Sequence, residues 1–154
     1  RVVSTPAIGA AREGLRLYRE TVKGKASGDI TKLAGDVGTL ERIAFASTEI
    51  DAMEALLYRN FDKMMVAAEA GEPISIEDRA LYRYQASLVI EKSMGVIDAL
   101  FSSAGGASVF SGSEIQQRFL DIHTARAHVA NNPTSFARNL GALSLGAQNQ
   151  DYFI

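Results

Sequence analysis

Apolar residues recur at helical spacing through the middle of the chain. Between residues 39 and 70 there is no glycine or proline, and Ile43, Ile50, Leu57 and Met64 follow one another at intervals of seven. This spacing is typical of a long amphipathic helix that packs against others. A helix longer than the globular average favours a bundle.

A second helical segment precedes this one. Pro6 can open a helix at its first turn, and the pattern runs to Gly24 with Ile8, Leu15 and Tyr18 on one stripe. Residues 1–5 are interpreted as a strand end or linker. Residues 23–38 are rich in Gly, Lys, Asp and Ser and predict a loop.

A third helix follows the break at Gly71-Glu72-Pro73. Ser75 is a good N-cap with Asp78 three residues on, and the helix is predicted from Ile76 to Ser102. Its apolar residues lie nearly all round the axis, so it should be central or covered by a partner subunit.

A fourth helix is predicted after the Gly-Gly break at 105–106, capped by Ser113 and running from Glu114 to about Ala130. On a helical wheel its apolar face holds Ile115, Phe119, Ile122 and Val129. His123 falls at the edge of that face, Arg126 falls inside it, and His128 falls on the polar side. Only His123 is therefore expected to face an interior.

The last predicted helix is short. It follows Asn131-Asn132-Pro133, is capped by Thr134 and runs from Ser135 to about Gly146, ahead of a tail interpreted as polar. No strand-like alternation of any length occurs. The predicted fold class is all-α: an antiparallel four-helix bundle with an additional short C-terminal helix.

The composition of the chain argues against several classes of function. The 154 residues are 47% hydrophobic and 22% charged, which indicates one folded domain. A net charge of −2 offers no basic excess for nucleic acid or an anionic membrane. There is no cysteine and no apolar run long enough to span a bilayer, which is consistent with a cytoplasmic protein. The chain begins at Arg1 without a methionine, and we expect a fragment or a processed product.

Two residues carry candidate chemistry. His123 at the edge of an apolar face could act as a general base or as a hydrogen-bond partner to a phenol or a flavin, or it could be a core histidine bonded to a backbone carbonyl. Arg126 could pair with Glu91 or Asp98, reach the surface, or contact an anion such as a cofactor phosphate.

Several motifs are missing. His123 and His128 are five residues apart and cannot form a metal pair on one helix face, and no HExxH or ExxH pair is present, so no metal site is predicted. Gly105-Gly106 alone is not a phosphate-binding loop. The residues alone predict a helical, oligomeric domain with one candidate histidine.

The segment from Ala86 to Pro133, ASLVIEKSMGVIDALFSSAGGASVFSGSEIQQRFLDIHTARAHVANNP, adds a resemblance. It resembles the C-terminal helical domain of the acyl-CoA dehydrogenase superfamily, and more closely its flavin-dependent monooxygenase branch, the oxygenase components of two-component aromatic hydroxylases. The resemblance covers residues 6–146 and is most specific from 97 to 133. It implies that residues 6–154 are a third domain, without the family's N-terminal helical and middle β domains.

The resemblance also implies site residues. The 104–110 loop matches the family's glycine-rich turn near the flavin, so Gly105, Gly106 and Ser108 are expected to bind the cofactor together with Arg126. His123 falls at the position of an active-site histidine. Ser113, Gln116 and Asp121 match a family run in which two arginines are replaced here by Gln117 and Leu120.

The activity implied is hydroxylation of an aromatic, phenolic or indolic substrate with O2 and reduced FAD or FMN supplied by a separate reductase, in a homotetramer. Residues 127–130 lack the carboxylate that dehydrogenases of this superfamily often carry there, which favours hydroxylation. Two alternatives stay open. One is an acyl-CoA dehydrogenase whose base lies outside this helix, and the other is a non-catalytic bundle that only mediates assembly.

Overall fold

The computed structural model describes residues 4–26, 31 and 36–154, and these form helices joined by turns, with no strand among them. Within the described ranges, five α-helices and two short 3₁₀ helices have defined bounds. They are α1 (Thr5–Lys25), α2 (Val37–Ala70), α3 (Ile76–Phe101), η2 (Gly106–Val109), α4 (Glu114–Arg126), η3 (Val129–Asn131) and α5 (Pro133–Ser144).

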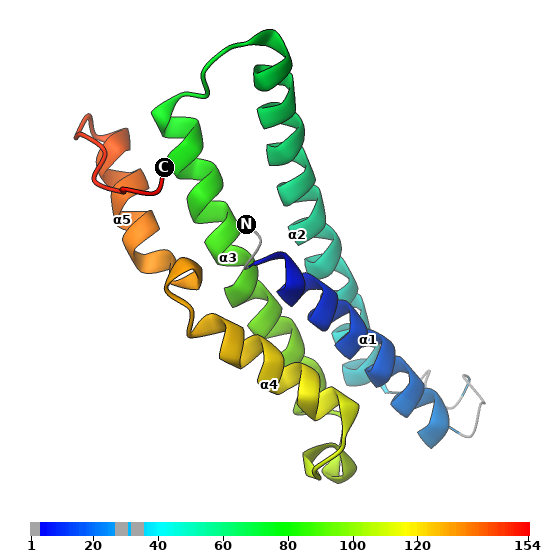
Figure 1. Cartoon of the computed structure of the whole chain (residues 1–154). Coiled ribbons are helices and arrows are strands. Elements are labelled where there is room, and N and C mark those ends of the chain that lie inside the picture. The colour runs from blue at the N-terminus through cyan, green and yellow to red at the C-terminus, as the bar shows by residue number, and fades with distance from the viewer. Residues whose placement is uncertain (1–3, 27–30, 32–35) are drawn as a thin grey trace.

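The helices form an up-and-down bundle around α3, as Figure 1 shows. α2 runs antiparallel to α1, α3 returns alongside α2, and α4 and α5 both run antiparallel to α3. α5 continues beyond α4 after a bend, and α3 packs against α1, α2, α4 and α5. The predicted fold class and the central position of the third helix are confirmed.

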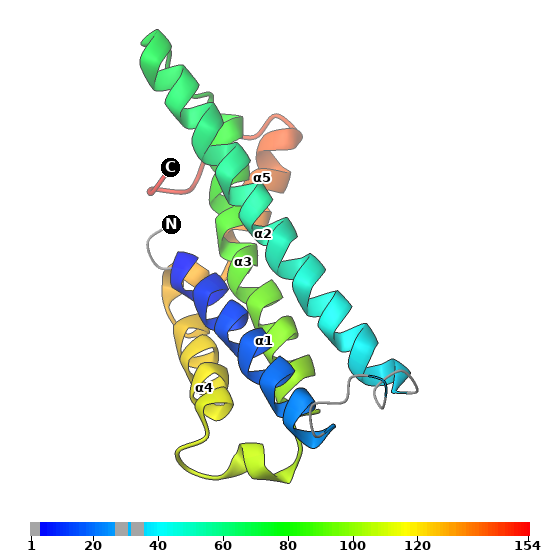
Figure 2. The same ribbon diagram turned by 90° about the vertical axis from the view of Figure 1, so that its right-hand side faces the viewer.

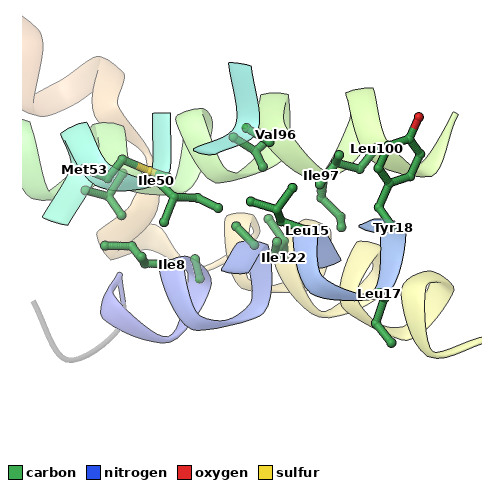
Figure 3. Packing of buried hydrophobic residues seen from close by; sticks show 14 of the residues in the cluster. Ile8, Leu15, Leu17, Tyr18, Ile50, Met53, Val96, Ile97, Leu100 and Ile122 are labelled. Carbon is green, nitrogen blue, oxygen red and sulfur yellow. The ribbon is translucent and has the colours of Figure 1, made fainter. Parts of the chain in front are cut away.

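The hydrophobic core lies along the buried side of α3. Val89, Ile90 and Val96 have no exposed surface, nor do Ile97 and Leu100. Figure 3 shows side chains from α1, α3 and α4, among them Leu15, Ile97 and Ile122, meeting in the centre of this cluster. At 100° per residue these five side chains fall within about 120° of the helix circumference, whereas Lys92, Gly95 and Asp98 on the opposite side are exposed.

Helix ends follow the expected local chemistry at two positions. The Ser75 hydroxyl accepts a hydrogen bond from the Asp78 backbone N–H at 3.0 Å, which confirms the predicted N-cap of α3. Gly71 ends α2 in the left-handed conformation with φ of 67°, where a side chain would be strained.

The fourth helix was predicted too long. α4 ends at Arg126, so Val129 is 79% exposed instead of facing the core. The side chain of buried Asn131 donates to the Ala125 carbonyl at 2.8 Å, and the Ala130 N–H donates to His128 Nδ1 at 3.1 Å. These side-chain bonds compete with continued helix and replace it with η3.

Other boundaries differ by small amounts. α5 begins at Pro133 and is capped by Asn132, whose side chain accepts from the Thr134 N–H, so Thr134 is not the cap. Thr5 already lies in α1, which removes it from the predicted linker. Ser113 occupies the N-cap position of α4 without a side-chain hydrogen bond. Of the predicted 23–38 loop, residues 27–30 and 32–35 lie outside the described range, as do residues 1–3 of the linker.

Candidate functional site

His123 lies on the seam between α4 and α3. Its Nε2 is 2.8 Å from Oδ1 of Asp98, near the end of α3. The histidine side chain is 33% exposed and the aspartate 48% exposed. His123 is therefore neither a core residue nor a surface residue free of contacts, and its hydrogen-bond partner is a carboxylate rather than a backbone carbonyl.

Aromatic rings hold the imidazole from one side. The ring centroids of Phe101 and Phe119 are 4.6 Å apart, and those of Phe119 and His123 are 4.2 Å apart. An ionised carboxylate only accepts hydrogen bonds, so Nε2 donates to Asp98. In the neutral ring Nδ1 then carries the lone pair, and it has no hydrogen-bond partner among the described residues.

Arg126 pairs with Glu91, one of the two partners considered from the sequence. Its Nε donates to Glu91 Oε1 across the same α3–α4 seam, with about a third of each side chain exposed. A guanidinium has five N–H donors. Its terminal nitrogens make no hydrogen bond within the part of the chain that the structure describes, and they are available to an anion.

The glycine-rich loop lies at the other end of α4 (Figure 2). Gly105 has φ of 94°, and a Cβ placed on Gly106 would meet nothing within 4 Å. The Ser108 hydroxyl donates to the Gly105 carbonyl at 2.6 Å, and Gln116 Nε2 donates to the Val109 carbonyl at 3.0 Å. These bonds tie the loop to itself and to the first turn of α4, and they engage the Ser108 hydroxyl.

The predicted site residues therefore form two groups. His123 and Arg126 share the α3–α4 seam, whereas Gly105, Gly106 and Ser108 lie beyond the N-terminus of α4. His123 is nine residues from Glu114, which is about 14 Å along the helix axis. The structure does not bring the two groups together in this chain. An elongated ligand laid along α4 would be needed to contact both.

The residues predicted to bind the flavin fit an elongated ligand of this kind only in part. The open side of Gly106 allows close approach of a flat group to the backbone. The terminal nitrogens of Arg126 suit a phosphate. Ser108 fits less well, since its hydroxyl already donates within the loop and keeps only its capacity to accept.

The sequence pattern did not predict a hollow beside His128, a residue that it assigned to the polar face of a longer helix. The hollow has a volume of about 560 Å³ and lies between α3, η3, α5 and the C-terminal tail. We call it the C-terminal hollow; Arg83, His128, Phe136, Asp151, Tyr152 and Phe153 are among the residues that line it. The signal available was the Asn131-Asn132-Pro133 break, together with the two aromatic residues in a tail taken as polar.

The topology and these contacts define a helical bundle with a histidine–aspartate pair on one seam and a glycine-rich turn at one end. Residues 1–133 match the family model described as the C-terminal domain of acyl-CoA dehydrogenase. The chain belongs to that family. Among the described residues, no helix is long and apolar enough to cross a membrane.

Two proteins that this chain resembles are named as parts of oxygenases. The chain is 30% identical over 135 residues to the flavin-dependent monooxygenase oxygenase subunit HsaA of Rhodococcus jostii, covering 85% of this chain and 35% of the relative. It is 26% identical over 109 residues to the oxygenase component of p-hydroxyphenylacetate 3-hydroxylase of Acinetobacter baumannii, covering 71% of this chain and 26% of that protein.

Solved structures agree with the sequence comparison. The crystal structure of the HsaA monooxygenase from M. tuberculosis superposes with a TM-score of 0.88 at 26% identity, covering 96% of this chain and 38% of that one. The structure of 3-HSA hydroxylase from Rhodococcus sp. RHA1 gives a TM-score of 0.87 at 27% identity, covering 99% of this chain and 38% of that one. The chain spans about a third of the length of the first curated relatives it matches.

Proposed function

We propose that this chain is the C-terminal helical domain of a longer flavin-dependent monooxygenase that hydroxylates an aromatic substrate. The observation that carries the proposal is the likeness to the HsaA oxygenase subunits, which extends over 85% of this chain in sequence and 96% in structure. The other two domains of the family are expected to precede it.

The proposed reaction uses O2, reduced flavin and an aromatic compound with a ring C–H bond. One oxygen atom replaces the ring hydrogen as a hydroxyl, the other leaves as water, and the reduced flavin supplies two electrons. When bound, the flavin supplies the oxygen-activating chemistry, which protein side chains lack. A separate reductase is proposed to deliver the flavin in its reduced form, as FAD or FMN.

The side chains of this domain have positioning and proton-transfer roles in the proposal. His123 would hold or accept a proton at Nδ1 while Asp98 fixes the ring through Nε2. Arg126 would contact a phosphate through its terminal nitrogens. Gly106, whose Cβ position is open, would let the backbone approach the cofactor, with Gly105 turning the chain before it and Ser108 accepting a hydrogen bond from the cofactor. The bundle would exclude water on its own side of the site.

A homotetramer is proposed for the full-length protein. The C-terminal end of α2 extends beyond α1 in Figure 2, and Met65 and Val66 near that end are 58% and 66% exposed. Tyr58, which lies beside the start of α1, is 66% exposed. An apolar strip of this kind suits burial in an interface between subunits. The proposed location is the cytoplasm, where a reductase can regenerate reduced flavin.

The test uses the full-length protein with an NADH-dependent flavin reductase. Under the proposal, phenols or indoles are hydroxylated in proportion to O2 consumed, and short-chain and medium-chain acyl-CoAs are not oxidised. Acyl-CoA oxidation with an artificial electron acceptor and no phenol hydroxylation would support the dehydrogenase alternative. Absence of flavin binding in the full-length protein would support a bundle that serves assembly alone.

A further inference from the structure

Lys25, the last residue of α1, connects that helix to the glycine-rich turn. Its Nζ donates a hydrogen bond to the Ala104 carbonyl at 2.9 Å, although the two residues are 79 positions apart in the sequence. Figure 2 shows the end of α1 and the glycine-rich turn at the same end of the bundle. The sequence pattern placed Lys25 in the predicted 23–38 loop, so this contact follows only from the fold.

Both partners of this hydrogen bond stand on anchored backbone. Val22 and Ala26, which flank Lys25 at the end of α1, are buried. Ala104 is buried as part of the hydrophobic core, and its N–H donates to the Phe101 carbonyl at the end of α3 at 3.1 Å. The bond from Lys25 therefore joins two segments that are already in place, and its particular effect is to set the direction of the Ala104 carbonyl.

The direction of the Ala104 carbonyl determines the direction of the next N–H. The described chain contains no cis peptide bond, and in a planar trans peptide the C=O and the N–H point in opposite directions. A carbonyl held toward Lys25 thus turns the Gly105 N–H away from Lys25. That N–H makes no hydrogen bond to a described residue. Lys25 in this way fixes the plane of the peptide that leads into the glycine-rich turn.

The Lys25 ammonium also occupies the space that a side chain at residue 105 would need. A Cβ placed on Gly105 would lie 3.0 Å from Lys25 Nζ. Within the turn, the Ser108 hydroxyl and N–H both donate to the Gly105 carbonyl, at 2.6 Å and 2.9 Å. Ser108 moves with the turn, whereas Lys25 and Gln116 tie its two ends to α1 and α4. Lys25 therefore relates the glycine-rich turn to a helix that is distant in sequence.

We propose that Lys25 is a positioning residue for the cofactor, which holds the Ala104–Gly105 peptide so that the glycine-rich turn keeps the shape in which it binds the flavin. This inference rests on the proposed function, in which Gly106 lets the backbone approach the cofactor. Lys25 acts through the turn, and its role requires no contact of its own with the flavin.

Titration of the full-length protein with FMN and with FAD, followed by flavin fluorescence, tests the proposal. Lys25→Met removes the donor and should raise the Kd of the flavin about three- to tenfold, as expected for the loss of one partly exposed hydrogen bond. Lys25→Arg keeps a charged donor and should restore the Kd to within about twofold. Lys23→Met is the matched control, because Lys23 lies exposed in the same turn of α1 and its loss removes the same charge.

The Kd separates positioning from a loss of folded protein, because a variant that is only less stable binds flavin at fewer sites with an unaltered Kd. In the 154-residue chain without flavin, ¹H–¹⁵N NMR should show shifted Gly105 and Gly106 amides in Lys25→Met and unshifted ones in Lys23→Met. The proposal is wrong if Lys25→Met leaves the Kd unaltered, if Lys23→Met raises it equally, if Lys25→Arg restores nothing, or if the amide shifts stay within α1.

Hydroxylation assays on the same full-length proteins separate this inference from the proposed function. If the unmodified protein hydroxylates phenols and Lys25→Met binds flavin equally well, the inference alone is overturned. A raised flavin Kd in Lys25→Met, without hydroxylation of any phenol by the unmodified protein, supports the inference and overturns the function. Absence of flavin binding in the unmodified protein would overturn both.

Discussion

At the residue scale, the contact between His123 and Asp98 decides which imidazole nitrogen is open to chemistry. The carboxylate occupies Nε2 at 2.8 Å and Phe119 packs against the ring. Both contacts restrict rotation of the imidazole, as an orienting group does for a catalytic histidine. Nδ1 is therefore the nitrogen that can exchange a proton with a bound molecule.

We predict that His123→Phe in the full-length protein lowers kcat for hydroxylation by roughly 10²–10⁴-fold, the usual contribution of a proton-transferring side chain. Phenylalanine keeps the stack on Phe119, so folding should be unaffected. Asp98→Asn should have a smaller effect, because the amide can still hold the ring. Product formation is measured by chromatography across pH. An unchanged kcat and pH profile in His123→Phe would remove the histidine from the mechanism.

At the element scale, two glycines of α1 lie in opposite environments. A Cβ on Gly14 would lie 2.5 Å from Cδ1 of Ile97, whereas a Cβ on Gly9 would meet nothing within 4 Å. Gly14 thus allows α1 to approach α3 closely. Gly9 makes no such contact and only weakens the helix.

We predict that Gly14→Ala destabilises the chain by about 1–3 kcal/mol, because the fully buried Ile97 has little room to move. Gly9→Ala is the matched control and should stabilise by roughly 0.5–1 kcal/mol through reduced backbone entropy of the unfolded chain. Urea unfolding followed by circular dichroism measures both. Equal effects of the two substitutions would show that α1 and α3 are not packed as described.

The N-terminus of α2 has a pH-sensitive cap. Asp36 accepts hydrogen bonds from the Thr39 hydroxyl at 2.7 Å and from the Thr39 N–H at 3.0 Å, and these bonds lower the pKa of its carboxyl. Because the folded-state pKa is depressed, the stabilisation is present above the unfolded-state pKa of about 3.9 and is lost as pH falls through the folded-state value.

We therefore predict that Asp36→Asn makes Tm fall less as the pH is lowered from 5 into the acid range, because asparagine caps the helix without titrating. Thermal unfolding at several pH values checks this. If the variant and the unmodified chain lose Tm in parallel as pH falls, the cap does not contribute to the acid dependence.

The sequence patterns predicted the helices correctly far more often than they predicted the contacts between helices. The heptad spacing of α2 and the all-round apolar pattern of α3 are local properties, so the helices and the central position of α3 followed from them. The end of α4 did not, because it depends on the Asn131 side chain reaching the Ala125 carbonyl. Asp98 was considered as a partner for Arg126, but only the packed helices assign it to His123 and Glu91 to Arg126.

The C-terminal hollow was beyond sequence reasoning for the same reason. It requires α5 to bend away from α4 and the tail to fold back onto α5 through Asn139 and Asn149. No periodicity encodes such a return of the chain. The family resemblance located the glycine-rich turn and His123 along the sequence, and the predicted helix from Glu114 already set their separation along the helix axis.

At the scale of the whole molecule, the domain presents groups that a complete flavoprotein would use but does not enclose a flavin by itself. The seam with His123 and Arg126 is partly exposed, and the glycine-rich turn ends in Phe110, which is 70% exposed. Other domains or subunits would have to close the site over these surfaces. The activity therefore has to be measured on the full-length protein.

The most direct measurement is the fate of ¹⁸O2 during turnover of the full-length protein with reductase, NADH, flavin and a phenol. The proposed monooxygenase places one ¹⁸O atom in the aromatic product and the other in water, and mass spectrometry should find the hydroxylated product heavier by one isotopic substitution. A hydroxyl group derived from unlabelled water, or a protein that oxidises acyl-CoA instead, would contradict the proposal.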